Sequence, residues 1–111
     1  MTVATKESLP TRVVCLINVV TLEELKDEED YEDILDDMKD ECGKYGRVKS
    51  IEIPRPVAGE EVGGLGKVYV EFAAVGDSIK ATNSLSGRKF AQRVVMTCYY
   101  DEERFNLRDF E

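Results

Sequence analysis

The sequence contains no histidine, and its three cysteines, Cys15, Cys42 and Cys98, are spread along 111 residues without a Cys-x-x-Cys pair. Zinc sites are usually built from closely spaced cysteines and histidines, and disulfide frameworks from an even number of cysteines. The sequence therefore predicts neither a zinc site nor a disulfide framework. We expect structural cysteines in a reducing compartment, no bound metal and no other cofactor.

Long apolar runs are also missing, and none approaches the roughly 18 residues that a membrane helix needs. The first ten residues lack the apolar segment of a signal peptide. We expect residues 1–10 to be a flexible lead-in, and residues 11–111 to form one domain that does not contact a membrane. That length is sufficient to bury a core without disulfides or metals.

Residue patterns of catalytic sites are equally scarce. No histidine is present to act as a base, and the serines lie in no recognisable nucleophile context. The segment at 64–67, GLGK, resembles a phosphate-binding loop only superficially, because Val68 stands where serine or threonine belongs and a strand follows. The acidic run at 27–37 lacks the glycine of a calcium loop. We therefore predict that the protein is not an enzyme.

Acidic side chains are abundant and concentrated in one segment. The net charge is −8, and residues 23–41 hold twelve of the 23 acids with only two bases, Lys26 and Lys39. Such a stripe repels nucleic-acid phosphates and attracts basic peptides. A solvated helix face that binds nothing is equally consistent with the charge alone.

Hydrophobic periodicity predicts an α+β domain. Four segments are typical of strands, at 12–20, 47–54, 66–72 and 93–100, and two are typical of helices, at about 27–45 and 74–86. A capping box at Thr21 and Glu24 precedes the first helix, and Asp101 is placed to cap a short final helix. The order β-α-β-β-α-β predicts a ferredoxin-like fold, a four-stranded antiparallel sheet with two helices on one face and an extra C-terminal helix.

Finer expectations follow from the same periodicity. Gly46 stands where a glycine with positive φ would end the first helix. The inner face of the second helix is expected to carry Val75, Ile79, Thr82 and Leu85. Gly87 is expected to end that helix.

The third strand segment can be compared with the octamer of the RNA recognition motif, K/R-G-F/Y-G/A-F-V-x-F/Y. Residues 65–72, LGKVYVEF, match its glycine and apolar frame. However, Lys67 occupies an RNA-stacking position, and only Tyr69 remains aromatic there. On the first strand, VCLINV resembles the companion hexamer, but Cys15 replaces the usual aromatic. Each base–aromatic stack contributes about 1–3 kcal/mol, so we expect this degenerate sheet to bind RNA poorly.

Three segments then point to a more specific resemblance. The degenerate octamer at 65–72, an acidic first helix and the Arg-x-Phe loop in 87–95 (GRKFAQRVV) together resemble the U2AF homology motif, an RRM-like family that binds peptides instead of RNA. The segment 40–57 (DECGKYGRVKSIEIPRPV) is similar to the same family. The resemblance implies a pocket between the two helices that captures a tryptophan. It implies that Phe90 packs against this tryptophan, and that Arg88 covers the ring and is held by Glu41. Lys89 receives no role.

The acidic helix takes part in the implied recognition. Asp33, Asp37 and Glu41 are spaced i, i+4, i+8 and so share one helical face, where the resemblance implies contacts with basic ligand residues. Ile34 lies on the apolar stripe of the same helix, where lining the pocket is secondary to packing in the core.

The resemblance also implies partners and a location. These are tryptophan-containing basic peptides of splicing factors, namely the branch-point-binding protein and a large scaffold subunit of the U2 particle, in 3′ splice-site recognition in the nucleus. It implies that other domains of a longer protein bind pyrimidine-tract RNA. We expect the domain to be a monomer.

Other interpretations stay open at this point. Phe90 could be a plain core residue, Arg88 an ordinary exposed arginine, and the aspartates simply solvated. The domain could be an RNA-binding RRM with atypical sheet chemistry. A weaker possibility is self-association of the acidic face with basic patches on a second copy.

Overall fold

The computed structural model describes residues 9–56, 62–90 and 93–111, with the main chain only at Phe90. The expected lead-in at 1–10 therefore lies almost wholly outside the described residues. None of the helices in these three ranges is long and apolar enough to cross a membrane.

A four-stranded antiparallel sheet organises the domain, as the sequence predicted. Its strands lie in the order β2-β3-β1-β6. Their bounds are β1 Val13–Ile17, β2 Val48–Glu52, β3 Lys67–Phe72 and β6 Met96–Tyr100. The central strands β1 and β3 are rich in valine, which fits a pleated surface covered on both faces. The predicted α+β ferredoxin-like fold is confirmed.

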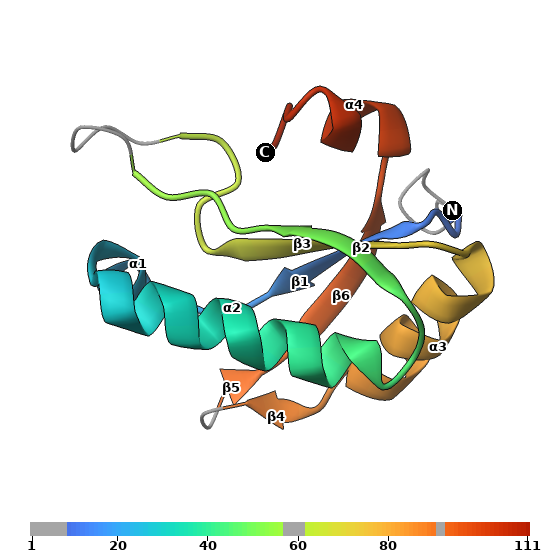
Figure 1. Ribbon diagram of the computed structural model, residues 1–111, viewed down its shortest axis with the longest axis horizontal. Coiled ribbons are helices and arrows are strands. Elements are labelled where there is room, and N and C mark those ends of the chain that lie inside the picture. Colours follow the sequence, from blue (N-terminus) through green and yellow to red (C-terminus); the bar gives the residue numbers. More distant parts are fainter. Residues whose placement is uncertain (1–8, 57–61, 91–92) are drawn as a thin grey trace, which may run out of the picture.

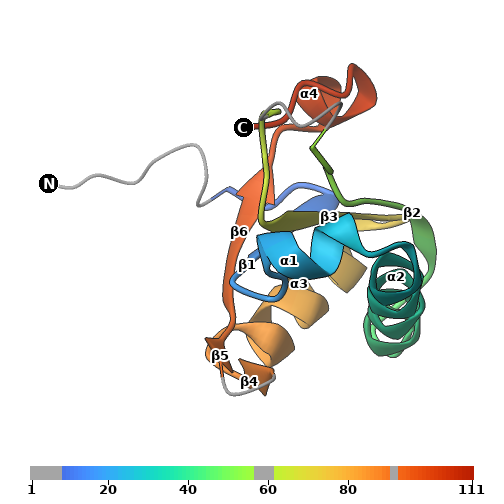
Figure 2. The ribbon, with the colours of Figure 1, turned by 90° about the vertical axis from the view of Figure 1, so that its left-hand side faces the viewer.

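Helices cover both faces of the sheet. On one face lie α1 (Leu22–Lys26), α2 (Glu28–Gly43) and α3 (Val75–Leu85), and on the other face lies α4 (Glu102–Asn106), as Figures 1 and 2 show. The predicted capping box is present, with the Thr21 side chain accepting from the Glu24 N–H and the Glu24 carboxylate accepting from the Thr21 N–H. Asp101 caps α4 as predicted.

Alternation along β3 divides its side chains between the two faces. Val68, Val70 and Phe72 are fully buried in the main core under α2 and α3, whereas Tyr69 belongs to a second cluster on the outer face. From α2, three residues of the predicted apolar stripe are buried in the main core: Ile34, Met38 and Cys42.

Two details of the helices differ from prediction. Helix α2 ends at Gly43, and Gly46 has no positive φ. Gly46 is instead required by close approach, because a Cβ there would collide with the side chain of Asp77. Val75 on α3 is 43% exposed and does not belong to the inner face.

The inner face of α3 consists of small and polar residues, together with Leu85. Ser78 and Ala81 are completely buried, and Thr82 lies beside them. The Ser78 hydroxyl donates to the Thr11 carbonyl, which ties the helix to the start of β1. Thr82 and Leu85 therefore lie on the inner face as predicted, and Ser78 and Ala81 take the place that was expected for Val75.

The predicted strand at 93–100 is interrupted. Arg93–Val94 forms β5, which pairs with β4 (Lys89–Phe90) in a small hairpin, and the buried Val95 separates it from β6. The hairpin is fastened to the end of α3 by main-chain bonds from Gly87 N–H to Val95 O and from Val95 N–H to Arg88 O, both 2.8 Å. Gly87 has φ 84° and ends α3 as predicted.

Candidate functional site

A pocket of about 130 Å³ opens between α2, α3 and the β4–β5 hairpin. Its apolar walls come from β1, the segment after it, both helices and the residue between β5 and β6. These wall residues are Leu16, Val19, Met38, Cys42, Leu85 and Val95, and Glu41, Arg88 and Lys89 complete the lining. The hairpin contacts described above hold the Arg88 main chain at this opening, beside the C-terminal end of α2.

The polar rim of the pocket centres on Glu41. Its carboxylate accepts from Arg88 Nη1 at 2.8 Å and from Lys44 Nζ at 3.0 Å, and Tyr45 Oη donates to it at 3.4 Å. Arg88 Nη1 also donates to Tyr45 Oη at 3.3 Å. Lys44 first, and Arg88 with it, hold the pKa of the Glu41 carboxyl below its usual range. Glu41 therefore stays ionised as an anchor for Arg88.

Arg88 remains accessible although it is anchored. Its side chain is 51% exposed, whereas that of Glu41 is 22% exposed. The planar face of a guanidinium fixed at one end can stack on an aromatic ring. The geometry therefore joins an apolar cavity to an accessible cation, a combination suited to an aromatic ligand side chain.

The other predicted site residues differ in where they lie. Asp33 and Asp37 are exposed on α2, on the same face as Glu41. Ile34 is 7% exposed and packs in the main core, and it is not among the residues that line the pocket. The Phe90 main chain forms β4 next to Arg88, while its side chain lies outside the described residues.

Three further residues lie at the rim. Lys89 lines the pocket although no role was expected for it, and Lys44 and Tyr45 contact Glu41 directly. The sequence could have indicated Lys44 and Tyr45 as neighbours of Glu41, because side chains three and four residues apart on a helix lie next to each other. The position of Lys89 at the pocket depends on the β4–β5 hairpin, which the sequence did not predict.

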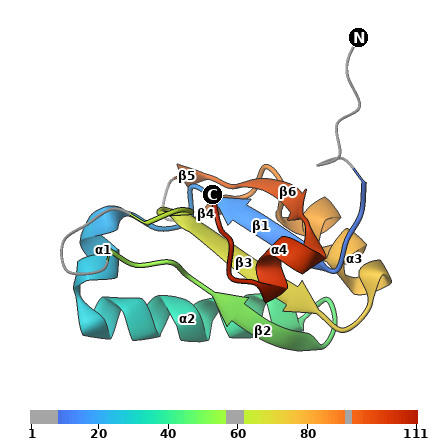
Figure 3. The same cartoon turned by 90° about the horizontal axis from the view of Figure 1, so that it is seen from above.

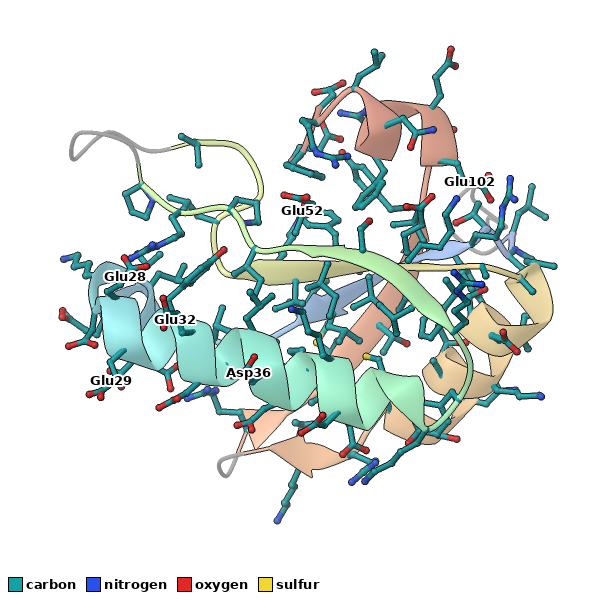
Figure 4. The ribbon with its side chains drawn as sticks, in the orientation of Figure 1. Glu28, Glu29, Glu32, Asp36, Glu52 and Glu102 are labelled. Carbon is teal, nitrogen blue, oxygen red and sulfur yellow. The ribbon has the colours of Figure 1, made fainter. Side chains whose placement is uncertain are left out.

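Acidic side chains continue along α2 away from the pocket. Figure 4 shows Glu29, Glu32 and Asp36 on the outward side of the helix, and all three are exposed. In the same view Glu52 projects from β2 toward the C-terminal segment, where Arg108 Nη2 lies 3.3 Å from its carboxylate. The described residues contain no group of three or more cysteine, aspartate or glutamate side chains placed to hold a metal ion.

The outer face of the sheet carries the degenerate RNA-recognition positions, and the C-terminal segment 101–111 crosses it (Figure 3). Tyr69 is fully buried, stacked against Phe110 with ring centroids 4.5 Å apart, and its hydroxyl donates to the Glu111 carbonyl at 2.8 Å. Lys67 Nζ donates to the same carbonyl at 2.7 Å. Cys15 is 1% exposed. The remaining ring of the octamer is thus covered and cannot stack on a base.

Comparison with known proteins gives a consistent result. The family described as the MUD2 C-terminal RRM domain matches residues 10–110. The chain is 50% identical over 105 residues to a U2af splicing factor large subunit of Triticum aestivum, covering 94% of this chain and 19% of that protein. It is 48% identical over 99 residues to a U2af splicing factor large subunit of Oryza sativa subsp. japonica, covering 88% of this chain and 17% of that protein.

A solved structure supports the fold. The structure described as "Structure of RNA15 RRM" superposes with a TM-score of 0.59 at 22% identity, covering 87% of this chain and 98% of that one. The predicted resemblance to the U2AF family is confirmed by the relatives, and the RRM fold by the superposition. The chain spans about a fifth of the length of the curated relatives it matches.

Proposed function

The chain belongs to the family of MUD2 C-terminal RRM domains, and we propose that it is a protein-interaction module of a pre-mRNA splicing factor. Its ligand is a basic peptide that contains a tryptophan. The indole enters the pocket between α2 and α3, Arg88 covers it, and the side chain of Phe90 packs against it. The acids of α2 select the basic residues that flank the tryptophan.

The observation that carries this proposal is the combination of an apolar pocket with an anchored, accessible arginine. The pocket of about 130 Å³ is close to the roughly 150 Å³ of an engineered apolar cavity that binds benzene. An indole is larger than benzene, so its outer edge remains at the rim. There it meets the guanidinium that Glu41 holds at 2.8 Å.

Most of the binding free energy should come from burial of the tryptophan. Its burial removes about 150–250 Å² from water, which is about 4–6 kcal/mol at 25 cal/mol/Å² before the entropy cost of binding. Cation–π attraction from Arg88 adds about 0.5–2 kcal/mol. Exposed ion pairs contribute about 0–1 kcal/mol each, so Asp33 and Asp37 mainly steer association and choose basic ligands.

The biological setting is part of the same proposal. The relatives in wheat and rice are named as large subunits of a splicing factor. We propose that this domain acts in the nucleus as a monomer and recruits other splicing factors to the 3′ splice site. The partners are a branch-point-binding protein and a scaffold subunit of the U2 particle, and RNA is bound by other domains of a longer protein.

Titration calorimetry with two peptides tests the proposal. A short peptide with one tryptophan flanked by arginines should bind, and the same peptide with alanine in place of tryptophan should bind at least about 100-fold more weakly, since a stabilisation of about 3 kcal/mol or more is lost. A pyrimidine-rich RNA is the third arm. Equal binding of both peptides, or tight binding of the RNA without either peptide, would exclude the proposed function.

A further inference from the structure

Two cysteines are paired on neighbouring strands of the central sheet. In the register of β1 and β6, Cys15 lies directly opposite Cys98, and the two strands are antiparallel neighbours. Directly opposed residues of such strands have Cα atoms about 4.5–5.5 Å apart, and disulfides span Cα separations of about 4.4–6.8 Å. The Cys98 side chain lies near enough to Cys15 to be the first cause that raises the pKa of the Cys15 thiol. The register therefore gives the pair a Cα separation that a disulfide can span.

The pair lies in a hollow that solvent reaches. A cavity of about 410 Å³ remains between the sheet and the C-terminal segment, and Cys15, Lys67, Cys98 and Arg104 are among the residues that line it. Cys98 is partly exposed, whereas Cys15 is buried behind it. A small oxidant can reach Cys98 first.

Charged side chains of both signs lie near the pair. Lys67 lies close enough to Cys15 to oppose the rise of the pKa of that thiol, which the Cys98 contact and burial otherwise cause. Lys67 and Arg104 both line the hollow, where Lys67 Nζ donates to the Glu111 carbonyl and Arg104 is ion-paired with Asp109. Acidic groups line it as well, at Asp101 and Glu111, but the Glu111 carboxylate is paired with Arg104 Nη2 at 2.8 Å.

We propose that Cys15 and Cys98 form a reversible dithiol–disulfide site on the outer face of the sheet, oxidised by hydroperoxides. The Cys98 thiolate attacks the peroxide oxygen and becomes a sulfenic acid, and hydroxide leaves and is protonated to water. The Cys15 sulfur then attacks the Cys98 sulfur, the S–O bond breaks, and the thiol proton leaves with the hydroxyl as a second water. Two thiols and one hydrogen peroxide thus give one disulfide and two waters. A dithiol reductant reverses the reaction.

The third cysteine provides an internal comparison. Cys42 is 1% exposed in the main core on the other side of the sheet, and burial raises the pKa of its thiol to about 12. It lies on helix α2, so no residue of a neighbouring strand is paired with it. Oxidation should therefore spare Cys42, and the site is separate from the pocket proposed to bind tryptophan.

Peptide mapping of the whole 111-residue chain after treatment with hydrogen peroxide tests the proposal. Remaining thiols are blocked with N-ethylmaleimide after unfolding, and the chain is cut with trypsin. The expected product is the fragment 13–26 joined to the fragment 94–104, with an intact mass lower by about 2 Da and full reversal by dithiothreitol. The fragment 40–44, which holds Cys42, should carry maleimide throughout.

Two variants sharpen the result. Cys98→Ser should abolish the joined fragments and leave Cys15 open to alkylation in the unfolded chain. Cys15→Ser should leave a sulfenic acid on Cys98 that dimedone traps, because the second thiol is missing. The proposal is overturned if both thiols of the wild-type chain stay alkylatable. Sulfinic acid at Cys98 without a joined fragment, or a Cys98 disulfide between two chains on a non-reducing gel, would overturn it as well.

Discussion

Glu41 shows how a few residues define the proposed site. Its carboxylate is shared between Lys44, which follows on the same helical turn, and Arg88, which comes from the hairpin after α3. The first contact is local and costs little to form, whereas the second joins distant parts of the chain. An exposed pair of this kind contributes little to stability, because solvent screens it. Its value in the proposed function lies in the orientation that it gives to the guanidinium.

Phe90 is the residue on which we expect the proposed tryptophan pocket to depend most. Phe90→Ala should weaken binding of the tryptophan peptide at least about 30-fold, because the loss of an aromatic contact in a desolvated pocket costs about 2 kcal/mol or more. Calorimetry measures this change. Val94→Ala, on the same hairpin and 47% exposed, is the matched control and should bind within about twofold of wild type. Unchanged affinity in Phe90→Ala would remove Phe90 from the site.

At the scale of elements, helix α2 has an apolar face and an acidic face. Its apolar stripe packs in the main core, and its acidic side chains stay in solvent. Those acids divide further, since Asp33 and Asp37 share the face of Glu41, whereas Asp36 lies on the outward side (Figure 4). Position on the helix, rather than charge alone, should decide which acids affect binding.

Asp37→Asn and Asp36→Asn remove the same charge from neighbouring positions of α2. Asp37→Asn should weaken the tryptophan peptide about two- to fivefold at low salt, and the difference from wild type should vanish as salt screens the contact. Asp36→Asn should change affinity less than about twofold at every salt concentration. Calorimetry at several ionic strengths makes the comparison. Equal losses in both variants would mean that α2 acts only through its net charge.

The C-terminal segment is a second element with a defined role. It covers Tyr69 with the ring of Phe110, and Phe105 is 1% exposed in the same cluster. Ion pairs with the rest of the domain hold the segment in place, including Glu102 with Arg12 and Arg108 with Glu52. The Tyr69 ring on the outer face of the sheet is thereby covered.

Phe110→Ala should lower the free energy of unfolding by about 1–3 kcal/mol, less than for a fully buried phenylalanine, because Phe110 is only partly buried. Leu107→Ala changes a residue of the same segment that is 73% exposed, and should have an effect within about 0.5 kcal/mol. Urea unfolding of the two variants gives the comparison. Equal stability of Phe110→Ala and wild type would show that the segment does not support the sheet.

At the scale of the whole molecule, the titratable groups predict how stability depends on pH. Cations hold the pKa values of Glu41, Glu102 and Glu111 below their usual range, through Lys44, Arg12 and Arg104 respectively. These groups have lower pKa values in the folded chain than in the unfolded chain. Their contribution is therefore present above the ordinary carboxyl value and is lost as pH falls through the folded values.

The pKa values of groups that titrate at alkaline pH are shifted in the opposite direction. Burial raises the pKa of Cys42 to about 12 and also raises that of Tyr69. The unfolded chain loses these protons first, so stability falls once pH exceeds the ordinary thiol value of about 8.5.

The free energy of unfolding should be nearly constant between about pH 5.5 and 7.5, because the chain has no histidine to titrate there. It should decrease below about pH 4.5, where the three glutamates of the unfolded chain begin to bind protons while those of the folded chain are still ionised. Urea unfolding across this range measures the curve, and Glu102→Gln should make the acid branch shallower. A step in stability near about pH 6.5 would contradict the assignment of the titrating groups.

Local sequence was sufficient to predict the four-stranded sheet, the two long helices that cover it and the short C-terminal helix. Alternation in 66–72 placed Val68 and Tyr69 on opposite faces of the sheet, and the capping box at Thr21 was correctly predicted, since both depend on residues close together in the chain. For the same local reason, the spacing of Asp33 and Asp37 predicted that they share a face of α2.

Contacts between segments that are distant in the sequence, in contrast, are determined by packing in three dimensions. The interruption at Val95, the close contact of Gly46 with Asp77 and the position of Lys89 at the pocket depend on the packing of α3 and the hairpin against α2. The opposition of Cys15 and Cys98 depends on the register of strands at opposite ends of the chain. Local periodicity determines which way a side chain points along its own element, but its partner is set by packing between elements.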